Sequence, residues 1–318
     1  MKKIIIYCIV IFYSYHLDAQ TPWLDFFKPA DSVNKHRILL ATAFTGLTYT
    51  AFSVGLYHAW YKNYDRSSLH SHNDWGEWYH MDKLGHVYNS FFQTALIYNT
   101  SRWSGLSSST NLWTGVGVSM LFQTTIEMMD GHSKGWGFSW PDMAANVLGI
   151  GFFISQQKIW NEQKMYLKFS AYPVIYPQLN TITKRVTHLF GINIGSKLLK
   201  DYNAQTYWFS MHPLEILNKK SNYWPAFLNI AFGYGAKGMY GAYENAWMDD
   251  EGQKINLSPL EYPRYSQYFL SLDLDLRKIP VRNNFLRSAL HIINIVKFPM
   301  PALEYNSLHR VTWHWLKF

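Results

Sequence analysis

Long uncharged segments dominate the first half of the chain. They lie at residues 38–60, 84–101, 103–126 and 143–157. The longest match the roughly 20 residues that are needed to cross the hydrocarbon core of a bilayer. Their many Thr, Ser, Asn, Gln and Gly residues make them weaker membrane spans than Leu-rich segments. The pattern therefore predicts a four-helix bundle over residues 35–162, either in a membrane or as a water-soluble bundle with a wide apolar core.

Period-two alternation in the second half of the chain predicts β-strands. Residues 266–276 alternate most clearly between apolar and polar side chains. Leu270 lies on one face, and Asp273 and Asp275 lie on the other face, which we expect to meet solvent. Further strands are expected at 165–176, 205–212 and 224–234, and a helix at 285–296. The predicted fold is thus a mainly α N-terminal four-helix bundle followed by a mixed α+β part with antiparallel strands over residues 163–318.

The start of the chain has the layout of a secretory signal peptide. Two lysines precede an apolar stretch over residues 4–17, which ends in polar residues near position 20. We therefore expect residues 1–20 to be removed on export. The single cysteine, Cys8, lies in this stretch, so the mature chain would have no disulfide and no thiol chemistry. Tyr7 stands where lipid-modified cysteines require a small residue, so no lipid anchor is expected.

Composition and charge favour a membrane surface as the partner. Aromatic residues make up 18% of the chain and charged residues 16%, and Trp and Tyr in such number are typical of membrane interfaces. The formal net charge is +8, and residues 161–318 hold 18 Lys and Arg against 11 Asp and Glu. This basic second half of the chain could face the head groups of anionic lipids. Export argues against nucleic acid, so we expect a membrane-associated protein of the cell envelope, at the inner or the outer membrane.

Polar side chains sit beside or within the uncharged segments at helical spacing. Three pairs share one helical face each: Asp82 with His86, Glu127 with Asp130, and Asp142 with Asn146. A lone buried charge costs several kcal/mol, so the three polar faces are expected to meet in one pocket. The side chain of His86 should then lie within about 4 Å of a carboxylate from another helix. Lys83 is expected to turn out to solvent or to cap the cluster.

Three spaced blocks resemble the YfiM-like family of predicted periplasmic lipoproteins of unknown function. The blocks are Asp-Lys-x-x-His, Glu-x-x-Asp-Gly and Ser-x-x-Asp-x-x-x-Asn-x-x-Gly. Here they are formed by Asp82, Lys83 and His86, by Glu127, Asp130 and Gly131, and by Ser139, Asp142, Asn146 and Gly149. The resemblance covers residues 75–160, and longer members carry a C-terminal extension. More distantly, the first and third blocks are similar to VanZ-like membrane proteins. The resemblance implies an envelope location and no particular reaction.

The cluster can be interpreted as a catalytic site, as a binding site or as a structural lock. In an enzyme, His86 would be the general acid or base, oriented by Asp82, with Glu127 or Asp130 as a second carboxylate. The residues expected to bind a ligand are Lys83, Ser139, Asp142 and Asn146. The substrate would be an envelope lipid or glycan. In a non-catalytic structural or accessory protein, the same residues would only pair with one another and fix the packing of the helices.

The sequence assigns no metal and no cofactor to this cluster. A metal site could use His86, Glu127 and Asp130, together with His80 or His132. No HExxH motif accompanies them, so the metal interpretation is not adopted. Whether the protein is an enzyme stays open at this point.

Overall fold

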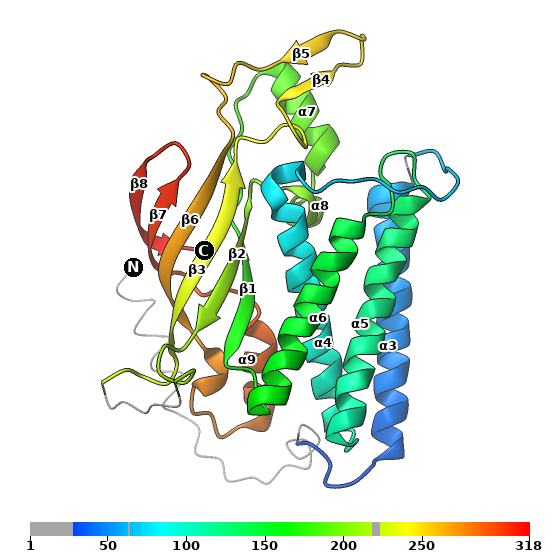
Figure 1. Cartoon of the computed structure of the whole chain (residues 1–318), viewed down its shortest axis with the longest axis vertical. Coiled ribbons are helices and arrows are strands. Elements are labelled where there is room, and N and C mark those ends of the chain that lie inside the picture. The colour runs from blue at the N-terminus through cyan, green and yellow to red at the C-terminus, as the bar shows by residue number, and fades with distance from the viewer. Residues whose placement is uncertain (1–27, 63, 218–222) are drawn as a thin grey trace.

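Four long helices form the first part of the described chain. The computed structural model describes residues 28–62, 64–217 and 223–318, so the expected signal peptide lies outside the described residues. The helices are α3 (Lys35–Leu56), α4 (Met81–Trp103), α5 (Ser108–Gly131) and α6 (Trp140–Trp160) (Figure 1). A π-helical turn, η1 (Tyr57–Tyr61), follows α3, and a 3-10 turn, η2 (Glu77–His80), precedes α4.

Side-chain caps fix where three of these helices begin. Asn34, Ser107 and Ser139 are the N-cap residues of α3, α5 and α6, and each side chain accepts a hydrogen bond from the backbone N–H three positions later. Such caps satisfy one of the otherwise unpaired N–H groups of the first helical turn and stabilise a helix by about 1 kcal/mol each. The cap at Ser139 also fixes the start of the helix that carries the third polar block.

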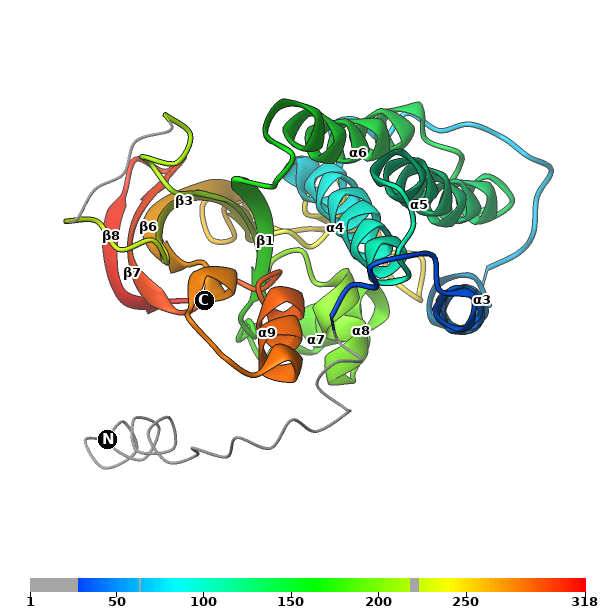
Figure 2. The ribbon, with the colours of Figure 1, turned by 90° about the horizontal axis from the view of Figure 1, so that it is seen from below.

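Three helices, rather than four, form a closely packed unit. Helices α4, α5 and α6 bury side chains against one another, whereas α3 has no buried residue. The expected four-helix bundle is therefore not confirmed. Helix α3 lies beside α5 (Figures 1 and 2), and its outward side chains, such as Leu39, Phe44 and Leu47, are largely exposed. Helix α3 is apolar all round and has no polar stripe to orient it against its neighbours, which is the pattern of a helix that is buried or spans a membrane.

Glycines allow α4 to approach its two neighbours closely. A Cβ atom on Gly115 of α5 would lie 2.9 Å from the Thr94 carbonyl oxygen of α4, and a Cβ on Gly149 of α6 would overlap the Val87 carbonyl. Small residues at helix interfaces are typical of membrane proteins. Here the two glycines let α5 and α6 pack closely on α4, so that polar side chains of the three helices can hydrogen-bond.

The C-terminal half is a mixed α+β part with antiparallel strands, as the sequence predicted. The six-stranded sheet has the order β1-β2-β3-β6-β7-β8, and every neighbouring pair is antiparallel. Its strands are β1 (Met165–Ala171), β2 (Gln205–Met211), β3 (Leu228–Lys237), β6 (Tyr265–Leu274), β7 (Met300–Asn306) and β8 (Val311–Lys317). A separate hairpin pairs β4 (Ala246–Met248) with β5 (Lys254–Asn256).

Short helices complete this half of the molecule. They are α7 (Asn180–Phe190), α8 (Ile194–Lys200), the 3-10 turn η3 (Leu276–Lys278) and α9 (Asn284–Ile293). Figure 2 shows that the sheet is curved, with α9 on its concave side and α4 outside the β1 edge. The expected domain boundary near residue 163 falls just before β1 and stays a prediction.

The polarity of β6 is the reverse of what the sequence suggested. Asp273 and Asp275 were expected to face solvent, but they are 0% and 3% exposed, whereas Leu270 is 48% exposed. Asp273 forms an ion pair with Lys168 of β1, and Asp275 pairs with Arg277. The expectation was wrong because Asp273 points to the interior of the curved sheet, where Lys168 lies, and Asp275 caps η3 beyond the end of β6.

Candidate functional site

The up-and-down course of α4, α5 and α6 brings the three polar blocks to one end of the helical unit. Asp82 and His86 lie in the first turns of α4, and Glu127 and Asp130 lie in the last turn of α5. Asp142 and Asn146 lie in the first turns of α6. Because consecutive helices run in opposite directions, a C-terminal block on α5 meets N-terminal blocks on its neighbours. The structure thus brings the expected residues together.

His86 lies between side chains from all three helices. Its Nδ1 atom lies 3.2 Å from Asn146 Oδ1 and 3.8 Å from Glu127 Oε1. Its Nε2 atom lies 3.8 Å from Asp142 Oδ1 and 3.9 Å from Asp82 Oδ1. Glu127 is 1% exposed, and its Oε1 atom accepts no hydrogen bond from the described residues. This oxygen is therefore available to a proton, a water molecule or a ligand next to the imidazole.

Lys83 points into the cluster instead of turning out to solvent. Its Nζ atom lies 2.8 Å from Asp74 Oδ2, 2.9 Å from Asp82 Oδ2 and 2.6 Å from Asp142 Oδ1. The side chain is 7% exposed. One ammonium therefore joins the loop before α4, the start of α4 and the start of α6. Three carboxylates around one cation leave an excess of negative charge, which favours a proton on one of them.

Ser139 connects the start of α6 to the rest of the site. Its backbone N–H donates to Glu127 Oε2 at 3.1 Å, and its hydroxyl donates to Asp74 Oδ1 at 2.6 Å. The same hydroxyl oxygen accepts the backbone N–H of Asp142 at 3.0 Å. Ser139 was expected to bind a ligand, and in the structure its polar groups hold Glu127 and Asp74 in place.

Three residues that contribute side chains to the site lie outside the three sequence blocks. Asp74 comes from the polar loop before η2, as described above. Tyr61 of η1 donates to Asp130 Oδ1 at 2.8 Å, and Tyr202, which follows α8, donates to Asp82 Oδ1 at 2.6 Å. Tyr202 is separated from Asp82 by 120 positions, so no spacing argument could have linked them.

Left-handed backbone immediately precedes the helix that carries His86. Trp78, Tyr79 and His80 have φ angles of 50°, 52° and 62°. Non-glycine residues adopt this conformation at a cost of about 1–3 kcal/mol each, and such residues concentrate at functional sites. The turn positions the first residues of α4, among them Asp82 and Lys83, against Tyr202 and the loop that contains Asp74.

The carboxylates of the site differ in their affinity for protons. Burial, together with the nearby charge of Asp82 and a hydrogen bond to Asp74, raises the pKa of Asp142 to about 9. Burial also raises the pKa of Glu127 to about 8, although the nearby His86 acts in the opposite direction. These shifts favour the protonated forms of Asp142 and Glu127 near pH 7, and a protonated Asp142 can donate a hydrogen bond to Asp74.

Asp82 and Asp74 are the ionised members of the cluster. Burial acts to raise the pKa of Asp74, but hydrogen bonds from Asp142, Lys83 and Ser139 lower it. Burial also acts to raise the pKa of Asp82, but His86, Lys83 and the Tyr202 hydroxyl together lower this pKa to about 2. Asp130 has an intermediate value: burial raises its pKa to about 7, against the hydrogen bond from Tyr61. A carboxylate and neutral carboxylic acids thus surround the same imidazole.

Asp82, His86 and Asp142 could offer ligand atoms to a metal ion. One atom from each lies within 4.8 Å of the others. Lys83 already contacts both carboxylates, so a divalent cation would have to displace or repel this ammonium. Two histidines considered for a metal site have other partners: the His80 ring packs at a tilt against Trp75, and His132 hydrogen-bonds the Ser67 carbonyl. The donor set therefore fits an ammonium better than a metal ion.

The comparison with known families agrees with the three blocks. Residues 48–157 match a family of predicted periplasmic lipoproteins (DUF2279). The matched segment contains every site residue that the sequence predicted, as well as Tyr61 and Asp74, but not Tyr202. The expected family resemblance and the expected cell-envelope location are confirmed by this match. No curated protein and no solved structure matches the chain.

Proposed function

We propose that this envelope protein is membrane-associated and that His86 performs acid–base chemistry on an envelope lipid or glycan. The observation that carries the proposal is the placement of His86 within 4 Å of carboxylates from three helices. Asp82 would stay ionised and orient the imidazole, and Glu127 or Asp142 would supply a proton. Titratable groups whose environments push their pKa values apart are typical of acid–base sites.

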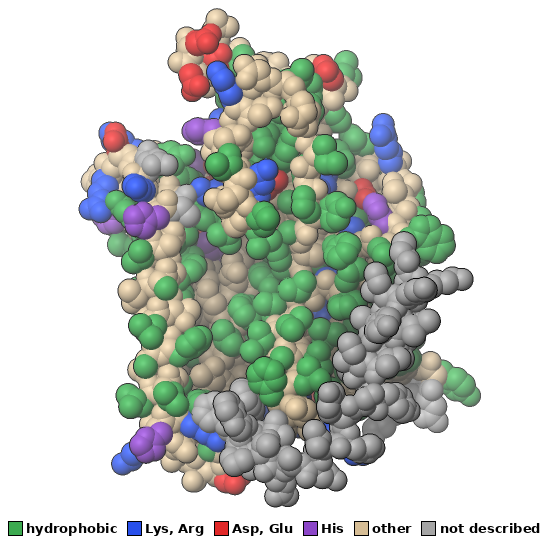
Figure 3. Space-filling view, turned by 180° about the vertical axis from the view of Figure 1, so that it is seen from behind, with side chains coloured by type: hydrophobic (Ala, Val, Ile, Leu, Met, Phe, Trp, Pro, Cys, Tyr) green, Lys and Arg blue, Asp and Glu red, His purple; other side chains and the backbone are tan. Residues whose placement is uncertain are grey.

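Exposed apolar surface supports the membrane part of the proposal. Among the described helices, α3 is the one that is long and apolar enough to cross a membrane, with a mean hydropathy of 1.4. On the face shown in Figure 3, hydrophobic side chains spread over the middle, and charged side chains gather toward the two ends. The site residues Asp82, Glu127, Asp130 and Asp142 lie just outside the uncharged segments of their helices. A site at that level could reach the head group of a lipid.

A structural role is the second candidate, and Lys83 is the observation that favours it. This ammonium is buried and bridges three carboxylates from separate segments. Removing one partner of a buried ion pair costs about 3–5 kcal/mol, so such a bridge could fix helix packing without any chemistry.

Mass spectrometry of envelope lipids and glycans would separate the two candidates. Four strains are compared: one that lacks the protein, and three that produce wild type, His86→Gln or His132→Gln. His132 is an exposed histidine of the same matched segment and serves as the control. If His86 is catalytic, His86→Gln gives the profile of the deletion while the purified variant keeps the wild-type melting temperature. A stable His86→Gln that restores the wild-type profile would contradict the proposal. If His86→Gln gives the profile of the deletion and also has a lowered melting temperature, the structural role is favoured.

A further inference from the structure

One face of the six-stranded sheet is apolar across its whole width. Residues paired in register form two rows that run over all six strands. The first row is Leu167, Phe209, Phe232, Leu270, Leu303 and Trp313, and the second is Phe169, Tyr207, Tyr234, Tyr268, Tyr305 and Val311. Side chains that pair in register share one face of a sheet. We call this face the convex face, because the sheet curves away from it toward α9 (Figure 2).

The opposite, concave face carries the charges of the sheet and buries them. Lys168 and Asp273 are both 0% exposed and lie 2.7 Å apart. Gln267 donates to Glu304 Oε1 at 2.6 Å, and His314 Nε2 lies 2.7 Å from Glu304 Oε2. In a water-soluble antiparallel sheet, the buried face is normally apolar and the solvated face polar. Here the buried face carries charged side chains together with the apolar cluster of Trp208, Ala231 and Phe269, and the opposite face is apolar.

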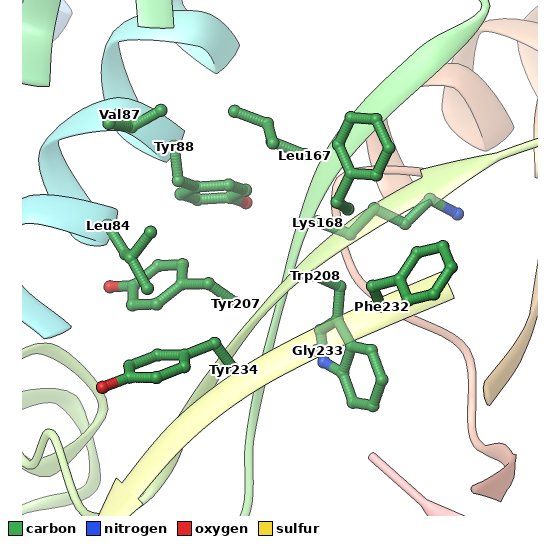
Figure 4. A pocket seen from close by; sticks show the side chains of 11 residues that line it. Leu84, Val87, Tyr88, Leu167, Lys168, Tyr207, Trp208, Phe232, Gly233 and Tyr234 are labelled. Carbon is green, nitrogen blue, oxygen red and sulfur yellow. The ribbon is translucent and has the colours of Figure 1, made fainter. Parts of the chain in front are cut away.

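Helix α4 covers only one edge of the convex face. A small cavity of about 200 Å³ separates Leu84, Val87 and Tyr88 of α4 from the rows at β1, β2 and β3 (Figure 4). Farther from α4, the side chains of the convex face are exposed: Phe232 is 48% exposed and Trp313 is 51% exposed. On β3, the Tyr234 hydroxyl donates to the Tyr79 carbonyl of η2 at 2.8 Å. From Phe232 to β8 the face is open, and Leu270, Leu303 and Tyr305 are between 42% and 48% exposed.

The ends of the strands indicate which partner covers this face. Strands β3 and β6 have 10 residues each, which fits the roughly 9–11 residues of a strand that crosses a hydrocarbon core, whereas β7 and β8 have 7 residues each and are shorter than that. The second row places tyrosines side by side near one end of the strands, as in the aromatic belts of membrane interfaces. Arg310 is exposed at that end, and Arg282 is exposed beyond the other end of β6. Basic side chains at these positions complement anionic lipid head groups.

We propose that the convex face from β3 to β8 lies against the acyl chains of a lipid bilayer. The C-terminal half of the chain is then inserted in the membrane across α4, α5 and α6 from α3 (Figure 1), with its charges enclosed on the concave side. This inference rests on the proposed membrane association and names a surface for it. It does not depend on any chemistry at His86.

Fluorescence quenching of single labels on the full chain tests this arrangement. Cys8 is replaced by serine, and a bimane label is attached to one new cysteine at a time: Leu270→Cys, Leu303→Cys, Leu47→Cys or Glu251→Cys. Leu47 lies on α3 and is 71% exposed, and Glu251 lies in the exposed β4–β5 turn. The proteins are reconstituted in vesicles of phosphatidylethanolamine and phosphatidylglycerol. Brominated acyl chains act as the quencher in the hydrocarbon, and iodide acts as the quencher in water.

The labels at 270 and 303 are expected to lose fluorescence to brominated acyl chains and to resist iodide, whereas the label at 251 shows the reverse. Quenching of 270 and 303 by iodide to the extent seen at 251 would overturn the inference. Membrane association by α3 alone would give acyl-chain quenching at 47 and iodide quenching at 270 and 303, which leaves the proposed function standing. If 270 and 303 resist both quenchers and self-quench until diluted with unlabelled protein, a second copy covers the face and the inference fails.

Discussion

Replacing Glu127 by glutamine should remove a large part of the pH dependence of stability. Glu127 is 1% exposed, and burial raises its pKa from the ordinary 4.5 to about 8. Below about pH 4.5 the side chain is protonated in the folded and in the unfolded chain and does not affect their balance. Between the two pKa values the unfolded chain loses the proton and the folded chain keeps it, so the free energy of unfolding falls as pH rises.

The size of this effect follows from the two pKa values. Their separation corresponds to a loss of about 5 kcal/mol by the time the pH has passed the folded-state pKa. Glutamine resembles the protonated acid, and its carbonyl oxygen can still accept the Ser139 N–H. Glu127→Gln should therefore match wild type near pH 4.5 and exceed it by as much as about 5 kcal/mol at pH 9.

Denaturant unfolding of the detergent-solubilised protein at pH 5, 7 and 9 measures the effect. The control is Glu251→Gln, which removes an exposed carboxylate from the β4–β5 turn and should leave the pH dependence of wild type. Because Asp130 and Asp142 are present in all three proteins, the difference between curves reports mainly on Glu127. The reasoning is refuted if Glu127→Gln loses stability between pH 5 and 9 as steeply as wild type does.

Two further predictions concern packing and the interior of the sheet. Gly149→Ala should lower the free energy of unfolding by about 1–3 kcal/mol because the added methyl overlaps the Val87 carbonyl. Gly151→Ala, with nothing within 4 Å of the new Cβ, should not destabilise in the same melt; equal losses would contradict the close helix packing. Lys168→Met should cost about 3–5 kcal/mol by leaving Asp273 buried and unpaired. Adding Asp273→Leu should recover most of that loss, and additive losses in the double variant would argue against a direct ion pair.

The sequence predicted which polar side chains of the helices come together because the signal for this is local. Asp82 and His86 are one turn apart, as are Asp142 and Asn146, and an uncharged helix with such a pair must find partners for it. Opposite directions of consecutive helices then place the blocks at one end. Tyr202 could not be found in this way, because its contact with Asp82 depends on how the C-terminal half packs against α4.

Sheet polarity shows a different limit of sequence interpretation. Alternation in β6 correctly separates Leu270 from Asp273, because a period of two fixes which side chains share a face. It does not tell which face meets the surroundings. If the surroundings were water, the polar face with Asp273 would lie at the surface. In the structure the aspartate meets Lys168, and leucine points outward.

The sheet and the site lie at one level of the molecule, and this links the two proposals. A Cβ on Gly85 would lie 2.9 Å from the Tyr207 hydroxyl, so the tyrosine row reaches the first turns of α4. Tyr202, which precedes β2, donates a hydrogen bond to Asp82 at the same place. If the convex face meets acyl chains, its tyrosines lie at the level of the lipid head groups. His86 would then face the ester, phosphate or glycosidic bonds of a lipid rather than its hydrocarbon. Those are the bonds on which an imidazole with neutral and ionised carboxyl partners can act by proton transfer.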